Sequence, residues 1–489
     1  MNEWTTMIEG QRAMRETLLR DPQRPLWHFV SPEGSCVPFD PNGAVYWNGR
    51  YHLCYIFQDG RGHCWGHASS HDLVHWRWHE PALAPAPGDA ERGIFSGNCF
   101  VNRDGAATML YHGVDAGNCV ATCSDPNLDK WAKLPSNPIV PNPKLDSPES
   151  KLYNSWDPHG WLEGGTYYAI FGGNPGTCTP PALFKAEELD AWRFVGPFMA
   201  HDMPGVESFE DVSCPDFFPL DGKHVLVCIS HALGARCYVG RWEGERFHPE
   251  SHQRMNWPGG ACFAPETLLD AKGRRLLWTW ALEARAWGKH SWEGVMTLPR
   301  VLSLAPDNTL LIDPAEELQQ LRVNPRPGRS VRVAPGAPVR LDGGDSLELE
   351  LTVRPHAGAR FGLKLRSSPG GEEETVVWHD PAAGVLRVDV AKASLDPEVV
   401  YRHFAARSAD NFGVTSQEAP FALRAGEALQ LRVFLDRSIL EVFANRRQCL
   451  TQRLYPTRPD SLDVVLVSEG GDCEVELVNV WDMAPANAW

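Results

Sequence analysis

The stretch DPNGAVYWNGRYHLCYIF, residues 40–57, decides the fold, because its pattern returns four more times along the chain. The pattern consists of a polar leader, a few apolar residues, a turn glycine and a strand-like apolar run. Asn-Gly and Asp-Gly pairs between apolar runs are strong signals for a β-hairpin. The later copies occupy residues 96–113, 157–173, 213–230 and 263–282.

The turn glycines of these five copies follow one another at intervals of 51–60 residues; they are Gly49, Gly105, Gly165, Gly222 and Gly273. A period of about 50 residues built from hairpins is typical of propeller blades with about four strands each. We therefore expect a five-bladed β-propeller over residues 25–320. The leaders precede their turns by similar distances, so the innermost strands should carry them, and a site should lie where they meet.

The pattern changes after residue 320. Residues 321–335 are rich in Pro, Gly and Arg and are predicted to be a linker, whereas residues 336–489 contain short alternating segments such as SLELELTV and LQLRVFLD. Such segments indicate a C-terminal antiparallel β-sandwich. Residues 1–24 are predicted to be an N-terminal helical extension. The expected fold class is thus all-β, a five-bladed β-propeller followed by a sandwich.

Charge and hydropathy exclude several functions. The 489 residues include 46 Lys and Arg against 62 Asp and Glu, for a formal net charge of −16. Such a surface repels phosphate backbones and anionic lipid, so we expect no nucleic-acid and no membrane partner. No apolar run approaches the ~20 residues that span a bilayer, and the N-terminus lacks the apolar core of a secretory signal. We therefore expect a cytoplasmic protein.

Cysteine and histidine spacing argues against a bound metal. The 13 cysteines lack the paired spacing of a zinc site, which favours reduced, buried thiols. His67, His71, His75 and His79 recur every four residues, but in a segment predicted to be strand and turn. We expect no metal and no organic cofactor. Sixteen of the 19 tryptophans precede residue 293, and their flat faces suit sugar rings as well as protein cores.

Six motifs in this order resemble glycoside hydrolase family 32, the family of invertases, inulinases, levanases and related fructosyltransferases. They are DPNG at Asp40, WGHASSHDLVHW at Trp65, FSGN at Phe95, WDP at Trp156, SCPDFFPL at Ser213 and TLPR at Thr297. The later stretch LRVFLDRSILEVFAN is similar to the family's C-terminal sandwich. The resemblance implies a propeller with a sandwich, which agrees with the repeat pattern.

The resemblance also implies a retaining mechanism with two carboxyl groups about 5–5.5 Å apart. The family's nucleophile falls on Asp40, and the aspartate that stabilises the transition state falls on Asp157. Trp65 and Phe95 match aromatic positions of the family's fructosyl pocket, although either could instead pack inside the blades. Ser96 lies beside Phe95 in the same motif and is a further candidate for contact with the sugar.

Three positions depart from the family pattern. Ser213 occupies the place of the glutamate that serves as general acid, and a serine hydroxyl does not donate a proton at neutral pH. Loss of a general acid typically costs about 10²–10⁴ in rate. Trp156 replaces an arginine, and Phe39 replaces an asparagine beside the nucleophile. We expect Phe39, Trp156 and Ser213 to contact a substrate other than plain sucrose.

Strand parity suggests two substitutes for the missing acid. If no bulge intervenes, positions an odd number of residues before the turn glycine face the channel. Glu266 lies seven residues before Gly273, and Asp211 lies eleven before Gly222. Glu266 is the predicted acid and Asp211 the alternative. A second interpretation of Glu266, as a solvated side chain at a strand end, is left open.

These expectations describe a glycosidase that acts on a small β-fructofuranoside or related furanoside. A fructosyltransferase or difructose-dianhydride enzyme, and a sugar-binding propeller without activity, remain as alternatives. The expected partner is a small carbohydrate, and a homo-oligomer stays open.

Overall fold

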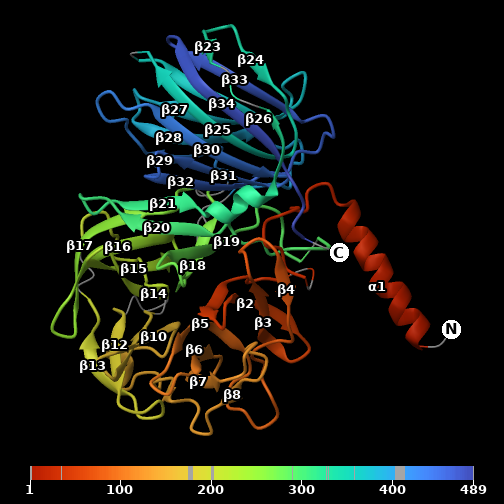
Figure 1. Ribbon diagram of the computed structural model, residues 1–489. Coiled ribbons are helices and arrows are strands. Elements are labelled where there is room, and N and C mark those ends of the chain that lie inside the picture. The colour runs from red at the N-terminus through yellow and green to blue at the C-terminus, as the bar shows by residue number, and fades with distance from the viewer. Residues whose placement is uncertain are drawn as a thin grey trace.

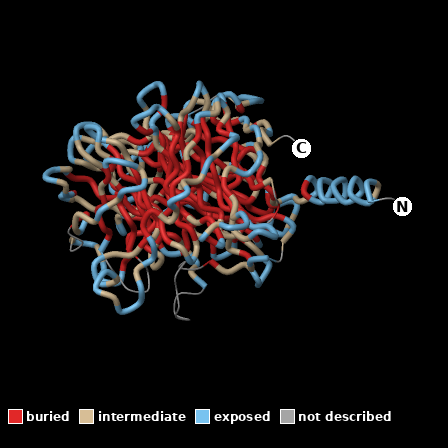
Figure 2. Tube along the Cα trace, turned by 90° about the horizontal axis from the view of Figure 1, so that it is seen from below, coloured by how far each residue is buried: buried red, intermediate tan, exposed pale blue. Residues whose placement is uncertain are grey.

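The computed structural model describes residues 3–487, except residues 33, 35, 174–179, 200–202, 289, 327, 329, 357 and 402–412. Its described part is a five-bladed β-propeller joined to a two-sheet β-sandwich, so the expected fold class is confirmed (Figure 1). Buried residues fill the body of the molecule and exposed ones coat it, whereas one helix projects from that body (Figure 2).

Each blade is built on a four-stranded antiparallel sheet with its strands in chain order. Blade 1 contains β1 (Pro41–Trp47), β2 (Arg50–Asp59), β3 (Gly62–Ser70) and β4 (Trp76–Trp78). Blade 2 contains β5 (Ile94–Val101), β6 (Ala107–Gly113), β7 (Gly117–Cys123) and β8 (Ala132–Lys133), and β9 (Val140–Pro141) pairs with β7. Blade 3 contains β10 (Pro158–Glu163), β11 (Thr166–Phe171), β12 (Ala182–Ala186) and β13 (Arg193–Pro197). Blade 4 contains β14 (Ser213–Leu220), β15 (Lys223–Ser230), β16 (Gly234–Trp242) and β17 (Phe247–Arg254). Blade 5 contains β18 (Cys262–Leu269), β19 (Arg275–Ala281), β20 (Arg300–Leu304) and β21 (Leu310–Pro314).

The first strand of each blade is innermost, because β1, β5, β10, β14 and β18 contact one another around the ring. Four of these strands begin with an irregularity. In β14 the register shifts between Ser213 and Asp216, and in β18 it shifts between Phe263 and Glu266; β1 and β5 shift in the same way. A β-bulge inserts one residue and reverses which face the following residues occupy. The bulges therefore decide which side chains meet in the channel.

The sandwich consists of two antiparallel sheets that enclose an apolar core. One sheet runs β22-β34-β25-β30-β31-β32 with β23 beside β34, and the other runs β24-β33-β26-β27-β28-β29. The strands of the first are β22 (Arg322–Arg326), β23 (Val331–Val333), β25 (Ser346–Pro355), β30 (Leu429–Asp436), β31 (Ile439–Ala444), β32 (Gln448–Arg453) and β34 (Cys473–Met483). Those of the second are β24 (Val339–Leu341), β26 (Arg360–Ser367), β27 (Glu374–Asp380), β28 (Val385–Lys392), β29 (Ser416–Pro420) and β33 (Asp463–Glu469).

The predicted linker, residues 321–335, is not a plain connection. It contributes β22 and β23, which both pair with β34. Proline is tolerated at sheet edges because no partner there needs its missing N–H, so Pro325 does not prevent β22 from forming. The short 3₁₀ helices are η1 (Glu149–Lys151) and η2 (Glu316–Leu321), and η2 directly precedes β22.

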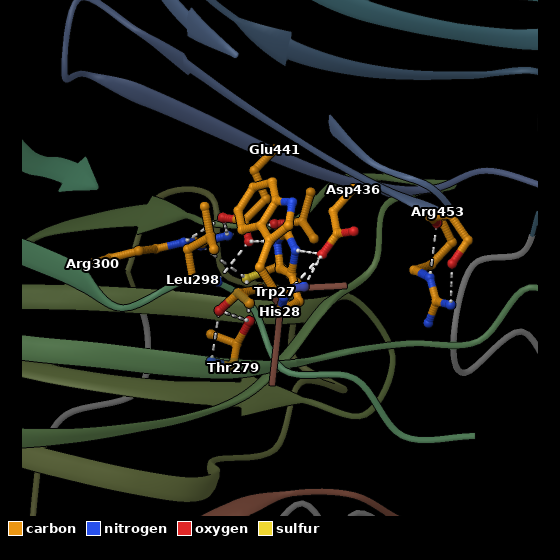
Figure 3. Close-up of polar contacts among 12 residues, drawn as sticks. Trp27, His28, Thr279, Leu298, Arg300, Asp436, Glu441 and Arg453 are labelled. Carbon is orange, nitrogen blue, oxygen red and sulfur yellow. Dashed lines mark hydrogen bonds and ion pairs between the residues drawn. The ribbon is translucent and has the colours of Figure 1, made fainter. Parts of the chain in front are cut away.

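A buried polar cluster joins the propeller to the sandwich (Figure 3). The His28 ring lies between two sandwich carboxylates, with Nδ1 2.9 Å from Asp436 and Nε2 3.2 Å from Glu441. Glu441 also accepts hydrogen bonds from the Leu298 backbone N–H and from Arg300. All four charged or ionisable side chains are fully buried. Removing one partner from such a cluster would leave an uncompensated buried charge.

The helix α1 (Glu3–Arg20) projects away from the body of the molecule (Figures 1 and 2). Leu18 is its buried residue and packs against Val30, Trp292 and Val295. Trp4 is 70% exposed, and most of the helix lies in solvent. None of the described helices is long and apolar enough to cross a membrane.

Candidate active site

Two buried aspartates meet at one end of the innermost strands. Asp40 directly precedes β1 and Asp157 directly precedes β10. Ser96 of β5 donates a hydrogen bond to Asp40 Oδ2 at 3.0 Å, and the Cys214 backbone N–H donates to Asp157 Oδ2 at 3.0 Å. The Cys214 thiol lies between them, with Sγ 4.0 Å from Asp40 Oδ2 and 3.6 Å from Asp157 Oδ2. Four blades thus supply one cluster.

The cluster raises the pKa of both carboxyl groups. Burial, reinforced by the charge of Asp157, raises the pKa of Asp40 to about 7, against the opposing effects of the Ser96 hydrogen bond and the charge of His231. Burial also raises the pKa of Asp157, which the Cys214 N–H and the charges of His112 and His231 oppose. Among the described residues, Asp40 Oδ1 has no hydrogen-bond partner. One oxygen of Asp40 is therefore oriented by Ser96, whereas the other is buried and unpaired.

Ser213 belongs to a hydrogen-bonded group beside these aspartates. Its hydroxyl donates to Asp211 Oδ2 at 2.6 Å and accepts from Trp156 Nε1 at 3.1 Å. Asp211 in turn accepts from both the backbone N–H and the ring Nδ1 of His231, at 3.0 and 2.8 Å. This carboxylate–imidazole pair is hydrogen-bonded to Ser213, the position at which the resemblance implies a glutamate.

Several predicted substrate contacts belong to the protein core instead. Phe39 and Trp65 are fully buried, so their side chains offer no surface to a sugar. Phe39 packs against Phe29 and Tyr55, and the Trp65 indole donates to the Phe95 carbonyl oxygen at 3.1 Å. This burial gives no support to their assignment as substrate contacts, because the apolar interior of the first blades encloses both rings.

The other aromatic and polar candidates lie at the site. Phe95 and Trp156 are half-buried, and His112 lies between them, with ring centroids 6.4 and 5.0 Å away. Ser96 holds the Asp40 carboxyl as described above. Ser213 is fully buried and reaches the site through its hydrogen bonds rather than through direct exposure. Phe95 and Trp156 remain predicted contacts.

None of the described contacts of Glu266 is with Asp40, and its assignment as the general acid remains a prediction. The bulge in β18 lies between Phe263 and Glu266, and the register with β19 is regular from Glu266 to Leu269. Glu266 Oε1 accepts the Ala44 backbone N–H at 2.8 Å, and burial together with the charge of Asp216 raises the pKa of Glu266 well above its usual range. Asp216 and Arg275 help line a separate cavity of about 390 Å³ farther along the innermost strands.

One group of the described residues has the atoms to hold a metal ion, namely His67, His79 and Asp129. His79 Nδ1 lies 2.6 Å from Asp129, and its Nε2 lies 2.7 Å from the Ser69 hydroxyl. The rings of His67 and His79 are stacked at 4.3 Å. Hydrogen bonds thus already occupy both ring nitrogens of His79, and the group serves to pack the blade.

Three residues of the site were not predicted from the sequence: His112, Cys214 and His231. Cys214 lies within the recognised SCPDFFPL motif, but its part in the site becomes evident only from its contacts beside Ser213 in the folded chain. His231 directly follows β15 and is brought to Asp211 by the hairpin between β14 and β15. No local motif marks His231 or His112, so sequence spacing offered no signal for either.

Two buried carboxyl groups that meet at one point can attack an anomeric carbon and stabilise the positive charge of an oxocarbenium-like transition state. On a propeller whose innermost strands converge on that point, they define a glycosidase.

Comparison with known proteins identifies the family. The profile of the Glycosyl hydrolases family 32 N-terminal domain matches residues 28–314, and that of the Glycosyl hydrolases family 32 C terminal matches residues 317–482. The chain belongs to glycoside hydrolase family 32 and is a fructosidase-type glycoside hydrolase.

Relatives and solved structures agree with this assignment. The chain is 30% identical to a sucrose-6-phosphate hydrolase of Klebsiella pneumoniae, over 91% of each chain. It is 26% identical to a fructan 6-exohydrolase of Beta vulgaris, over 95% of this chain and 88% of the relative. The crystal structure of fructan 1-exohydrolase IIa from Cichorium intybus has the same fold, with a TM-score of 0.81, 21% identity and coverage of 96% and 98%.

Proposed function

We propose that this protein hydrolyses a small β-fructofuranoside with retention of configuration, using Asp40 as the nucleophile and a general acid other than glutamate. The observation that carries the proposal is the geometry of Asp40. Ser96 orients one carboxyl oxygen, and the other has no partner among the described residues. A free, oriented carboxylate oxygen is what attack on an anomeric carbon needs.

In the first step Asp40 Oδ1 attacks the anomeric carbon, C2 of the fructosyl unit, and the bond from C2 to the leaving oxygen breaks. Positive charge develops on the ring, and the Asp157 carboxylate stabilises it from its buried position. Asp157 is held for this role by the Cys214 N–H. Water then releases fructose from Asp40 in a second step, which restores the carboxylate.

The substrate class rests on the relatives. The names of the proteins that this chain resembles include sucrose-6-phosphate hydrolase and fructan exohydrolase, and one solved relative carries 1-kestose. Sucrose 6-phosphate, fructans and 1-kestose all contain a fructofuranosyl unit. Sucrose, sucrose 6-phosphate and 1-kestose therefore form the first substrate panel.

Asp40→Asn tests the proposal directly. The substitution keeps the shape of the side chain but removes the nucleophilic oxygen, so kcat/KM should fall by about 10⁴-fold or more, the scale of loss when a nucleophile is deleted. Asp104→Asn, in an exposed turn of blade 2, is the matched control and should retain full activity. Melting temperatures of both variants should stay near that of the parent protein.

Near-normal turnover in Asp40→Asn would contradict the retaining mechanism. Binding of these sugars without any turnover by the parent protein would instead favour a sugar-binding propeller.

A further inference from the structure

We propose that His231, held by Asp211, is the general acid/base that takes the place of the missing glutamate. This inference rests on the proposed function. No sequence motif includes His231, and only the fold brings it next to Asp211.

The geometry orients the His231 ring. Its Nδ1 lies 2.8 Å from Asp211 Oδ2, and its backbone N–H donates to Asp211 Oδ1 at 3.0 Å. A carboxylate can only accept, so Nδ1 carries a proton and donates it. Among the described residues no hydrogen bond involves Nε2, and the side chain is 35% exposed. Nε2 is therefore the atom that can exchange a proton with a ligand.

The charges around His231 favour its protonated form, which can act as a general acid. Burial alone would lower the pKa of His231, but the hydrogen bond and charge of Asp211 outweigh it and raise that pKa, aided by the charges of Asp157 and Asp40. The ring of Phe263 on β18 packs against the same imidazole at 6.0 Å and brings no charge. Asp211 and Phe263 thus contact His231, and the charges of Asp211, Asp157 and Asp40 all favour the imidazolium.

Asp211 itself is a poor acid in this setting. Burial would raise its pKa, but its hydrogen bonds and ion pair with His231, together with the Ser213 hydroxyl, lower the pKa below the usual value. A carboxyl group that stays ionised has no proton to give. Both its oxygens are also occupied, by His231 and Ser213. Asp211 is therefore a positioning residue.

The proton balance of the reaction closes with His231 in this role. In the first step Nε2–H donates its proton to the glycosidic oxygen while the C2–O bond breaks and Asp40 bonds to C2, so the aglycone leaves as a neutral alcohol. In the second step the neutral imidazole accepts a proton from water, whose oxygen attacks C2 as the bond to Asp40 breaks. His231 ends protonated and Asp40 ionised, as they began.

The test compares His231→Gln with the parent enzyme on two kinds of substrate. On sucrose or 1-kestose, with poor leaving groups, kcat/KM should fall by about 10²–10⁴-fold. On an activated aryl β-fructofuranoside, whose leaving group needs no proton, the loss should be far smaller. Azide, a nucleophile that needs no base, should accelerate turnover of the aryl substrate by the variant and give fructosyl azide.

Two further variants separate this role from a structural one. Asp211→Asn removes the charge that raises the pKa of His231, so the basic limb of the kcat/KM profile should move to lower pH. Glu266→Gln keeps an acceptor for the Ala44 N–H and should leave activity and leaving-group dependence unchanged. If Glu266→Gln instead shows the leaving-group dependence and azide response, Glu266 is the acid and the inference is overturned.

Equal losses in His231→Gln on both kinds of substrate, without an azide response, would also overturn the inference, yet leave the proposed function intact. Absence of turnover by the parent enzyme on every fructofuranoside tested would contradict the proposed function itself.

Discussion

At the scale of single residues, Ser96 and Asp157 act on the Asp40 carboxyl in opposite directions. The Ser96 hydrogen bond stabilises the carboxylate, whereas the charge of Asp157 and burial raise the pKa of Asp40 to about 7. A nucleophilic carboxylate must be ionised, so kcat/KM should fall as the pH drops through about 7. Deprotonation thus sets the acid limb of the pH profile.

Ser96→Ala should move this acid limb to higher pH, because it removes the group that lowers the pKa of Asp40. A shift of one pH unit would lower the rate on the limb about tenfold. Ser96→Thr keeps the hydroxyl and serves as the control. The measurement is kcat/KM of the free enzyme between pH 5 and 9 on an aryl fructofuranoside. An acid limb that stays in place in Ser96→Ala would mean that another group controls it.

The site residues that could be predicted from the sequence are those that lie within short motifs. Asp40 and Asp157 were found because each lies in a short motif at the start of a repeat. The strand-parity argument for Glu266 and Asp211 assumed regular strands, whereas β14 and β18 each carry a bulge, and a bulge of this kind leaves no reliable mark in a single sequence. His231 was missed because its function depends on Asp211, twenty residues earlier, across a hairpin.

At the scale of secondary-structure elements, the repeat pattern predicted the blades because every hairpin carries its own turn glycine. The two strands within the predicted linker were not foreseen, for a different reason. β22 and β23 are short edge strands that pair with β34, which follows them by 140 residues or more. Their composition, rich in Pro and Arg, resembles that of a loop, so a long-range contact decides their structure.

The projecting helix α1 gives an element-scale prediction. Deleting residues 1–16 removes mostly exposed side chains, so the melting temperature should change by less than about 2 °C, or below about 1 kcal/mol for a domain of this size. Leu18→Ala should cost more, about 2–5 kcal/mol, because Leu18 fills a core with Trp292 and Val295. Thermal unfolding of both variants checks the contrast; an equally large loss on deletion would show that the helix packs against the body.

At the scale of the whole molecule, the cluster around His28 couples the two domains. Burial alone would lower the pKa of His28, but its hydrogen bonds to Asp436 and Glu441 outweigh burial and raise it. Because the folded pKa exceeds the unfolded value of about 6.5, this contribution to stability is complete below pH 6.5. It is lost as the pH rises through the folded pKa.

We therefore expect Glu441→Gln to destabilise the protein by about 3–5 kcal/mol, because it leaves Arg300 buried without its carboxylate. The melting temperature of the parent protein should also fall toward alkaline pH, and that of His28→Gln should depend less on pH over the same range. Asp313→Asn, whose aspartate pairs with Arg446 at the exposed edge of the same interface, is the control for Glu441→Gln and should change stability by under about 1 kcal/mol. Equal stabilities of Glu441→Gln and the parent would contradict this account.

Closure of the propeller ring affects the order in which parts of the newly made chain become stable. Among the described strands, none is shared between blade 1 and blade 5. Instead, backbone hydrogen bonds join Phe29, Ser31, Gly34 and Cys36 to residues 293–296. The backbone N–H groups of Leu26, Trp27 and His28 donate to the Asp436 carboxylate. A ribosome makes this aspartate more than 100 residues after the last blade. At about 5–20 residues per second, the hydrogen bonds from residues 26–28 to Asp436 can therefore form only several seconds after the blades have been made.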